Sequence, residues 1–152
     1  MRICFLFLSI ISVFSGFTQE VKPEVAHWNF YAETVVLKNE INLIFEVKLE
    51  VGWHTYSQRE VTDGPVPTKI SITPAPELFE LVGNVMEPIG EKKMDEAFGI
   101  EITSFEKEVK FLQTIRKKSK NKIIISGNVE YMTCNSVQCN PPRTIPFSIT
   151  IP

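Results

Sequence analysis

The sequence predicts an all-β protein: an immunoglobulin-like antiparallel β-sandwich preceded by a cleavable signal peptide. Three segments, residues 41–49, 123–131 and 145–151, alternate apolar residues with others. Such alternation is typical of half-buried antiparallel strands, because successive side chains of a strand point to opposite faces. No segment predicts a helix longer than two turns. The predicted buried faces are Ile41, Leu43, Phe45, Val47 and Leu49; Ile123, Ile125, Val129 and Tyr131; and Ile145, Phe147, Ile149 and Ile151.

Shorter segments bring the predicted number of strands to eight or nine, as expected for a sandwich. Turn-forming residues separate them. Asp63-Gly64-Pro65 lies in a longer loop, Lys38-Asn39-Glu40 predicts a tight turn, and the charged run 117–122 predicts a solvated hairpin turn. Residues 87–99 are predicted to form a loop, and residues 24–152 a single domain. The shorter candidate strands are residues 25–31, 33–38, 68–73, 78–83 and 108–115.

Residues 1–18 have the three-part layout of a secretory signal peptide. Arg2 supplies the positive charge, residues 3–14 form an apolar run, and small residues follow. This run is shorter than the about 20 apolar residues that a membrane-spanning helix needs. We expect cleavage near Thr18 or Gln19 and export of the chain, with an uncleaved signal anchor as the alternative. Cys4 would leave with the signal.

The composition of the remaining chain gives no sign of nucleic-acid binding. Removing Arg2 from the 16 basic residues leaves 15 against 18 acidic residues, a formal charge of −3, and no basic patch is present. The mature chain is long enough to form one domain with a hydrophobic core. It keeps two cysteines, Cys134 and Cys139, in a compartment where disulfides persist.

The two cysteines stand in the motif YMTCNSVQCNPP, and three interpretations of the pair are open. As a structural staple, the pair closes a loop of six residues. Such a loop stabilises by about 2 kcal/mol, against roughly 4.7 kcal/mol for a hundred-residue loop. As a zinc site, the pair lacks partners, because zinc takes four ligands and His27 and His54 lie far away in the sequence. Met132 beside the pair would suit Cu(I).

A working dithiol is the third interpretation. Two thiols between the end of one strand and the start of the next can open and close while the sandwich stays intact. Pro141 and Pro142 stiffen the exit from this segment. No Lys or His lies within six residues of either cysteine, and only Arg143 is near. We therefore expect thiols that are not strongly acidified and that exchange with a more reactive partner.

The segment VEYMTCNSVQCNPPRTIPFSI resembles the end of the N-terminal periplasmic domain of DsbD, the thiol–disulfide interchange protein. That family has a strand ending in an aromatic residue, a close cysteine pair, two prolines and a final alternating strand. VGWHTYS (51–57) and PTKISITP (67–74) resemble two of its strands, and MDEAFG (94–99) resembles its cap loop. The resemblance extends from about residue 25 to residue 150 and implies an immunoglobulin-like fold.

The resemblance also implies a function and a set of site residues. The family accepts electrons from a membrane-linked thioredoxin-like domain and passes them to oxidised periplasmic proteins, without a cofactor or a metal. Cys139 corresponds to the cysteine that forms the mixed disulfide with a partner, and Cys134 to the one that resolves it. Phe98, with Asp95 and Glu96 beside it, corresponds to the shielding aromatic residue of the cap loop. Trp53, His54, Tyr56 and Tyr131 would line the surroundings of the pair.

Two departures from the family pattern and two other functions complete the interpretation. Well-known members have one more residue between the cysteines, so the hairpin tip is tighter here. Their domain is usually followed by a membrane segment and a thioredoxin-like domain, whereas this sequence ends at Pro152, so we expect a separate reductant. If the chain is an enzyme, the activity we expect is that of a protein-disulfide reductase-type electron relay. The alternatives are an exported module that binds a protein or glycan and has a structural disulfide, and a copper-binding domain.

Overall fold

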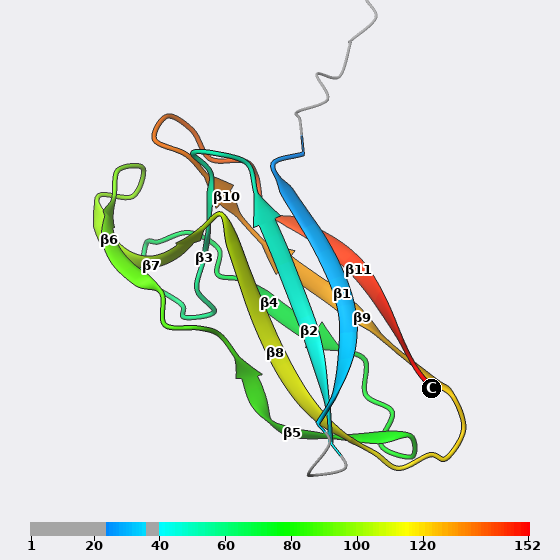
Figure 1. The fold of residues 1–152 in the computed structure, drawn as a ribbon. Coiled ribbons are helices and arrows are strands. Elements are labelled where there is room, and N and C mark those ends of the chain that lie inside the picture. Colours follow the sequence, from blue (N-terminus) through cyan, green and yellow to red (C-terminus); the bar gives the residue numbers. More distant parts are fainter. Residues whose placement is uncertain (1–23, 36–39) are drawn as a thin grey trace, which may run out of the picture.

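Eleven β-strands and no helix make up residues 24–35 and 40–152, the part of the chain that our computed structural model describes (Figure 1). The all-β sandwich expected from the alternating segments is therefore confirmed. The predicted signal peptide, residues 1–18, and most of the predicted turn at residues 38–40 lie outside the described residues. Within the described residues, no helix exists that could cross a membrane.

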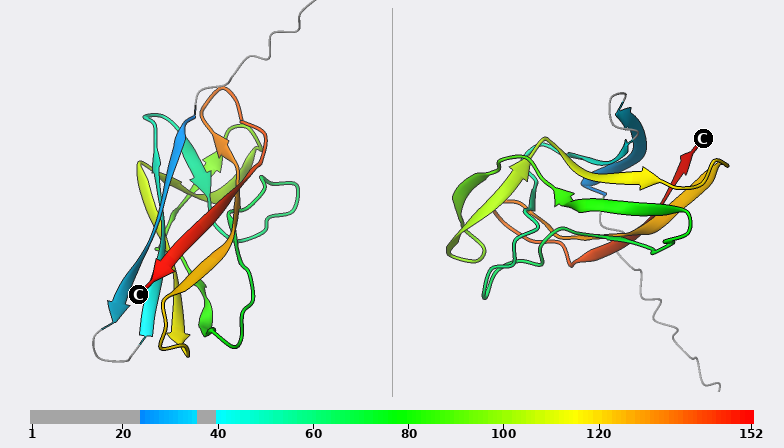
Figure 2. Two further views of the ribbon diagram at one scale, coloured as in Figure 1. Left: turned by 90° about the vertical axis from the view of Figure 1, so that its right-hand side faces the viewer. Right: turned by 90° about the horizontal axis from the view of Figure 1, so that it is seen from below.

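The strands form three antiparallel sheets, ordered β1-β2-β8-β5, β11-β9-β4 and β10-β3-β7-β6. The first two sheets are the layers of the sandwich, and β1 also lies beside β11 at one edge (Figure 2). The strands are β1 (Ala26–Val35), β2 (Glu40–Leu49), β3 (His54–Tyr56), β4 (Lys69–Ile72), β5 (Phe79–Met86), β6 (Glu91–Asp95), β7 (Ile100–Glu106), β8 (Glu108–Lys117), β9 (Ile123–Tyr131), β10 (Thr133–Cys134) and β11 (Arg143–Ile151).

The third sheet extends both layers at one end of the molecule. Strand β7 leads into β8 through Lys107, which has a positive φ of 64°, and β9 leads into β10 through Met132. The third sheet therefore contains one strand continuous with each layer: β7 adjoins β8 of the first layer, and β10 adjoins β9 of the second. Figure 1 shows it at the end of the molecule away from the C-terminus.

The core confirms the predicted alternation. Every second residue of β8 and β9 is buried, and the predicted faces of β2, β9 and β11 pack together between the two layers. Phe45 and Phe111 are fully buried, and Phe147 lies 4.9 Å from Phe45 between ring centroids. An aromatic cluster thus fills the middle of the sandwich.

Several predicted boundaries are wrong, for identifiable physical reasons. The two strands predicted at residues 25–31 and 33–38 are a single strand, because Ala26–Val35 pairs continuously with β2. The predicted loop 87–99 contains β6, an edge strand whose exposed Glu, Lys and Met residues give no apolar alternation. β7 has no predicted counterpart, since its buried residues change face between Ile102 and Phe105. β3 and β10 are too short for a periodic pattern.

Candidate functional site

One face of the third sheet gathers the polar and sulfur-bearing side chains. In the antiparallel pairing, Cys134 lies opposite His54, His54 opposite Glu106, and Tyr56 opposite Ser104. Residues directly opposite one another in an antiparallel pair project from the same face, as do alternate residues along a strand. The same face therefore carries Cys134, His54, Tyr56, Ile100, Ile102, Ser104, Glu106, Glu91, Lys93 and Asp95.

Cys134 and Cys139 form a disulfide bond across the cysteine hairpin, residues 134–139. The sulfur atoms are 2.03 Å apart and the Cα atoms 4.0 Å apart. Cys134 is fully buried, with 0% of its surface exposed, whereas Cys139 is only partly buried. The two cysteines also pair as an isolated antiparallel bridge. One sulfur-bearing residue therefore faces the interior and the other lies nearer to solvent.

Asn135 shapes the tip of the cysteine hairpin. Its Oδ1 atom accepts hydrogen bonds from the backbone N–H groups of Val137 (2.9 Å) and Gln138 (2.8 Å), and its own N–H donates to the Gln138 carbonyl (2.9 Å). An Asn side chain that bonds the backbone two residues ahead is a common way to build a tight turn. At the base of the hairpin, the Asn140 side-chain amide donates to Thr133 Oγ1 at 3.1 Å. These bonds fix the separation of the two cysteines.

Asp95 connects the third sheet to the cap turn, residues 96–99. Its Oδ1 atom accepts hydrogen bonds from the N–H groups of Ala97 (3.0 Å) and Phe98 (3.2 Å). Its Oδ2 atom accepts from the Tyr56 hydroxyl at 2.8 Å and lies 3.3 Å from His54 Nε2. The carboxylate is 6% exposed, so solvent competes little for these bonds. Asp95 therefore holds the cap turn in place relative to β3.

Phe98 packs against the small apolar cluster that contains the disulfide. The cluster is built on Tyr56, Ile102 and Cys134. Phe98 meets Tyr56 edge to face, with ring centroids 6.2 Å apart. This cluster is separate from the main core of the sandwich. The other partly buried members are Val61, Ile100, Met132 and Cys139.

The Tyr56 hydroxyl is held in its neutral form. Burial raises its pKa above the usual value near 10, and the hydrogen bond to the Asp95 carboxylate and the charge of that group raise it further. Tyr56 therefore acts as a permanent donor to Asp95 at neutral pH.

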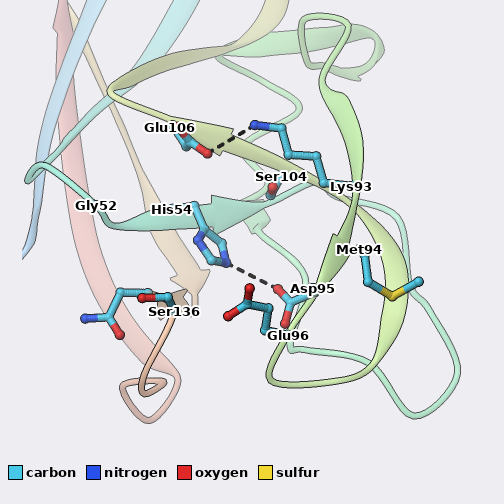
Figure 3. A pocket seen from close by; sticks show the side chains of 10 residues that line it. Gly52, His54, Lys93, Met94, Asp95, Glu96, Ser104, Glu106 and Ser136 are labelled. Atoms are coloured by element: carbon cyan, nitrogen blue, oxygen red, sulfur yellow. Dashed lines mark hydrogen bonds and ion pairs between the residues drawn. The ribbon is translucent and has the colours of Figure 1, made fainter.

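A polar pocket of about 220 Å³ opens beside the cysteine hairpin. Figure 3 shows His54 and Asp95 on one side of it, with Ser136 of the hairpin below and Lys93 bonded to Glu106 above. The Lys93 ammonium lies 3.3 Å from the Glu106 carboxylate and 3.0 Å from that of Glu91. Water in this pocket therefore has access to His54, whose side chain is 20% exposed.

The structure brings most of the predicted site residues together. Cys134, Cys139, Phe98, Asp95, His54 and Tyr56 lie in the cluster or in direct contact with one another, and Glu96 lines the pocket with its side chain exposed. Tyr131 instead packs in the main core, 5.3 Å from Trp28 between ring centroids. Among the described residues, Trp53 belongs to neither the cysteine cluster nor the pocket lining.

Sequence reasoning missed three contributions to the site. Ile102 of strand β7 and Val61 of the loop after β3 pack in the apolar cluster that contains the disulfide. Asn135 could have been identified, since an Asn followed by Ser at a hairpin tip is a turn signal. Within the described residues, no three His, Cys, Asp or Glu side chains lie together as a metal site would require.

Comparisons with known proteins identify the fold and the family of the chain. The N-terminal domain of DsbD from Neisseria meningitidis, in the reduced form, superposes with a TM-score of 0.50 at 23% identity, over 80% of this chain and 84% of that one. The N-terminal periplasmic domain of ScsB from Proteus mirabilis gives 0.55 at 18% identity, over 90% of this chain and 50% of that one. These likenesses concern the fold.

A third solved structure, the complex between the DsbD and PilB N-terminal domains of Neisseria meningitidis, gives a TM-score of 0.49 at 22% identity, over 78% of this chain and 80% of that one. No curated protein sequence matches significantly. A family model for the N-terminal domain of the thiol:disulfide interchange protein DsbD matches residues 19–150. The chain therefore belongs to the family of DsbD N-terminal domains, which serve thiol–disulfide exchange, as the resemblance of its cysteine motif predicted.

Proposed function

We propose that the chain is a periplasmic electron relay. It takes electrons from a membrane-linked thioredoxin-like donor and passes them to oxidised periplasmic proteins through the Cys134–Cys139 pair. The observation that carries the proposal is the disulfide across a hairpin, in an apolar cluster that includes Phe98 and is separate from the main core. A pair in that position can open and close without disturbing the sandwich.

The unequal burial of the two cysteines supports different roles for them. Thiol–disulfide exchange requires access of the attacking thiolate to a sulfur atom. Cys139 is partly exposed, whereas Cys134 is fully buried. Cys139 is therefore the cysteine that forms the mixed disulfide with a partner. Cys134 then attacks Cys139 and releases the reduced partner.

The cap turn protects the pair between encounters. Phe98 contacts the cluster around the disulfide, and Asp95 fixes the turn from behind. A reduced dithiol in an oxidising compartment would otherwise lose its electrons to unsuitable disulfides. Because Phe98 is held by hydrogen bonds rather than by the core, a partner can displace it. Asp95, Glu96 and Phe98 thus control which partners reach Cys139.

The proposed location requires export of the chain. Residues 1–18 act as the signal peptide in this proposal, and residues 24–152 form the exported domain. The partners are thioredoxin-like proteins that form transient mixed disulfides with Cys139. N-terminal sequencing of the exported protein tests this part, and a mature chain beginning near Gln19 is the expected result.

Mixed-disulfide trapping tests the relay itself. The variant Cys134→Ser in its reduced form, incubated with a thioredoxin that lacks its resolving cysteine and carries a thionitrobenzoate leaving group on the other, should accumulate a covalent complex through Cys139 that dithiothreitol reduces. The wild-type protein in its reduced form should reduce the same thioredoxin without accumulating the complex. Cys139→Ser should do neither. If the wild-type pair neither accepts electrons from a reduced thioredoxin nor donates them to an oxidised one, the relay proposal is wrong. The alternative, a binding module with a structural disulfide, then explains the pair.

A further inference from the structure

The fold places a histidine beside the buried cysteine. His54 of β3 lies directly opposite Cys134 of β10, and both side chains project from the same face. Opposite residues of an antiparallel pair have Cβ atoms about 4.5–5.5 Å apart. The sequence around the cysteine pair contains no base of its own, and β3 supplies one from a distant part of the chain.

The hydrogen bonds around His54 determine which ring nitrogen carries the proton. Nε2 lies 3.3 Å from Asp95 Oδ2 and 3.1 Å from the Tyr56 hydroxyl. Tyr56 already donates its proton to Asp95 at 2.8 Å. Nε2 is therefore best placed as a second donor to the carboxylate. In a neutral imidazole, Nδ1 is then the unprotonated acceptor.

We propose that His54, oriented by Asp95, accepts and returns the proton of the Cys134 thiol during exchange. The inference rests on the proposed function, since it concerns the step in which Cys134 resolves the mixed disulfide. A thiol buried among apolar groups holds its proton more tightly than one in water, and only the thiolate attacks. An oriented acid–base group is the arrangement by which other nucleophiles are activated.

The proposed step balances as follows. The proton on Cys134 Sγ passes to the His54 imidazole as Cys134 Sγ attacks Cys139 Sγ. The Cys134–Cys139 bond forms, the bond between Cys139 and the partner sulfur breaks, and the partner leaves as a thiolate. The two cysteines together lose two electrons, and the partner disulfide gains them and becomes a dithiol. The proton on His54 reaches the leaving thiolate or the water of the adjacent pocket.

Other charged groups around His54 set the conditions of this transfer. Asp95 faces it from β6, Tyr56 from its own strand and Glu106 from β7. The Glu106 carboxylate is paired with Lys93 at 3.3 Å, and Glu96 lies on the pocket wall. Asp95 is thus the charged group that contacts His54 directly. Since His54 borders the pocket, its proton can exchange with solvent.

A chromogenic aromatic disulfide, 5,5′-dithiobis(2-nitrobenzoic acid), separates the two steps of the reaction. The reduced protein releases one thionitrobenzoate when Cys139 attacks, at a rate that depends on probe concentration. It releases a second when Cys134 resolves the mixed disulfide, at a rate that does not. In the wild-type protein, we expect the second rate to rise by clearly less than about tenfold per pH unit across the neutral range, because His54 takes the proton of the thiol within the protein.

The variant His54→Gln should slow the second release by about 100-fold at neutral pH, the lower end of the effect of a positioned general base. Its rate should then follow the thiolate fraction alone and rise about tenfold per pH unit. The first release should be unchanged and shows that the hairpin is intact. His27→Gln is the matched control, because His27 is an exposed histidine paired with Glu50 at 3.0 Å.

Two results would overturn the proton-transfer role. One is a second release in His54→Gln with the wild-type rate and pH profile. The other needs no variant: a wild-type second rate that already rises about tenfold per pH unit across the neutral range, as expected of a thiol without a base beside it. Either result leaves the proposed electron relay valid if the reduced protein still reduces thioredoxin. Conversely, a protein with the expected two-step profile that exchanges with no thioredoxin loses the relay and keeps the proton transfer.

Discussion

Asp95 is the residue that joins the cap turn to the sheet beneath it. One of its carboxylate oxygens accepts two backbone N–H groups of the turn, and the other accepts the Tyr56 hydroxyl. The carboxylate is nearly buried, so removing it leaves these donors without partners in a place that water reaches poorly. The position of Phe98 in the cluster that contains the disulfide therefore depends in large part on the Asp95 side chain.

Replacing Asp95 should loosen the cap more than it weakens the fold. We expect Asp95→Ala to lose about 1–3 kcal/mol of unfolding free energy, the cost of leaving buried donors unsatisfied. Alkylation of the reduced Cys139 by iodoacetamide should accelerate severalfold, because Phe98 no longer stays in place. Glu101→Gln is the control, since Glu101 is an exposed carboxylate on the opposite face of the third sheet and its loss should leave the rate unchanged. Equal alkylation rates in wild type and Asp95→Ala would show that the cap turn keeps its position without the Asp95 side chain.

Tyr56 gives the protein a pH dependence in the alkaline range. The pKa of its hydroxyl is raised in the folded state by burial and by Asp95, so the folded protein keeps a proton that the unfolded chain releases above about pH 10. Its contribution is fully present below that pH and is lost as the pH rises further. We expect wild-type unfolding free energy to fall by up to about 1.4 kcal/mol per pH unit more steeply than that of Tyr56→Phe above pH 10. Urea titrations at successive pH values measure the difference, and parallel profiles would contradict it.

The residues of the site were predictable only where a motif carried them. The cysteine pair was identified as a candidate dithiol from its spacing, and the Asp95–Phe98 segment by its resemblance to a family; Phe98 lies in the cluster that contains the cysteines. The contact of His54 with Asp95 depends on the pairing of β3 with β7 and of β7 with β6, which no local pattern reveals. Tyr131 was misplaced because its alternation marks it equally well as a core residue, and the core is where it packs.

At the scale of the element, the cysteine hairpin is built to hold two thiols close together. The Asn135 side chain accepts two backbone N–H groups across the tip, and Asn140 bonds Thr133 at the base. These bonds do not involve the sulfur atoms, so they persist when the disulfide opens. The reduced hairpin should therefore keep its cysteines at a high effective concentration for each other, which favours the disulfide form.

Removing the Asn135 side chain should make the disulfide easier to reduce. Asn135→Ala loses two hydrogen bonds at the tip, each with a net effect of about 0.5–1.5 kcal/mol. Because the reduced hairpin becomes more flexible, we expect the equilibrium constant for reduction by glutathione to rise by about tenfold, the equivalent of about 1.4 kcal/mol. Asn135→Asp, which keeps an acceptor oxygen, is the matched control and should stay near wild type. An unchanged equilibrium in Asn135→Ala would mean that the strands alone fix the cysteine separation.

The elements of the sandwich could be predicted where one face is buried and the other exposed. β2, β8, β9 and β11 have regular apolar faces, and each was identified near its observed bounds. β6 is an exposed edge strand with a single buried residue, Asp95, so hydrophobic periodicity says nothing about it. β7 and β8 are separated by the positive φ of Lys107, and the buried residues of β7 already change face before it. Strands that build the site are thus the least periodic ones.

On the scale of the whole molecule, stability and function occupy separate clusters. The main core lies between the two layers and contains Phe111, which is fully buried, whereas the disulfide belongs to the small cluster on the third sheet. The immunoglobulin-like architecture was predictable because it needs only alternating strands of suitable length. The position of the third sheet at one end was not, since it depends on how β7 and β10 continue from the layers.

The separation of the two clusters predicts that the disulfide contributes less to stability than a single core ring. Cys134→Ala/Cys139→Ala removes a crosslink that closes a loop of only six residues, and the expected loss is about 2 kcal/mol. Phe111→Ala leaves a cavity in the sandwich and should lose about 3–5 kcal/mol. Urea unfolding of the oxidised wild type and of both variants measures these values. The double variant should keep the wild-type circular dichroism spectrum and lose all exchange with thioredoxin, whereas Phe111→Ala should exchange at the wild-type rate wherever it is folded. A double variant that unfolds, or that loses more stability than Phe111→Ala, would mean that the crosslink is a structural brace for the sandwich, and the case for a reversible dithiol would fail with it.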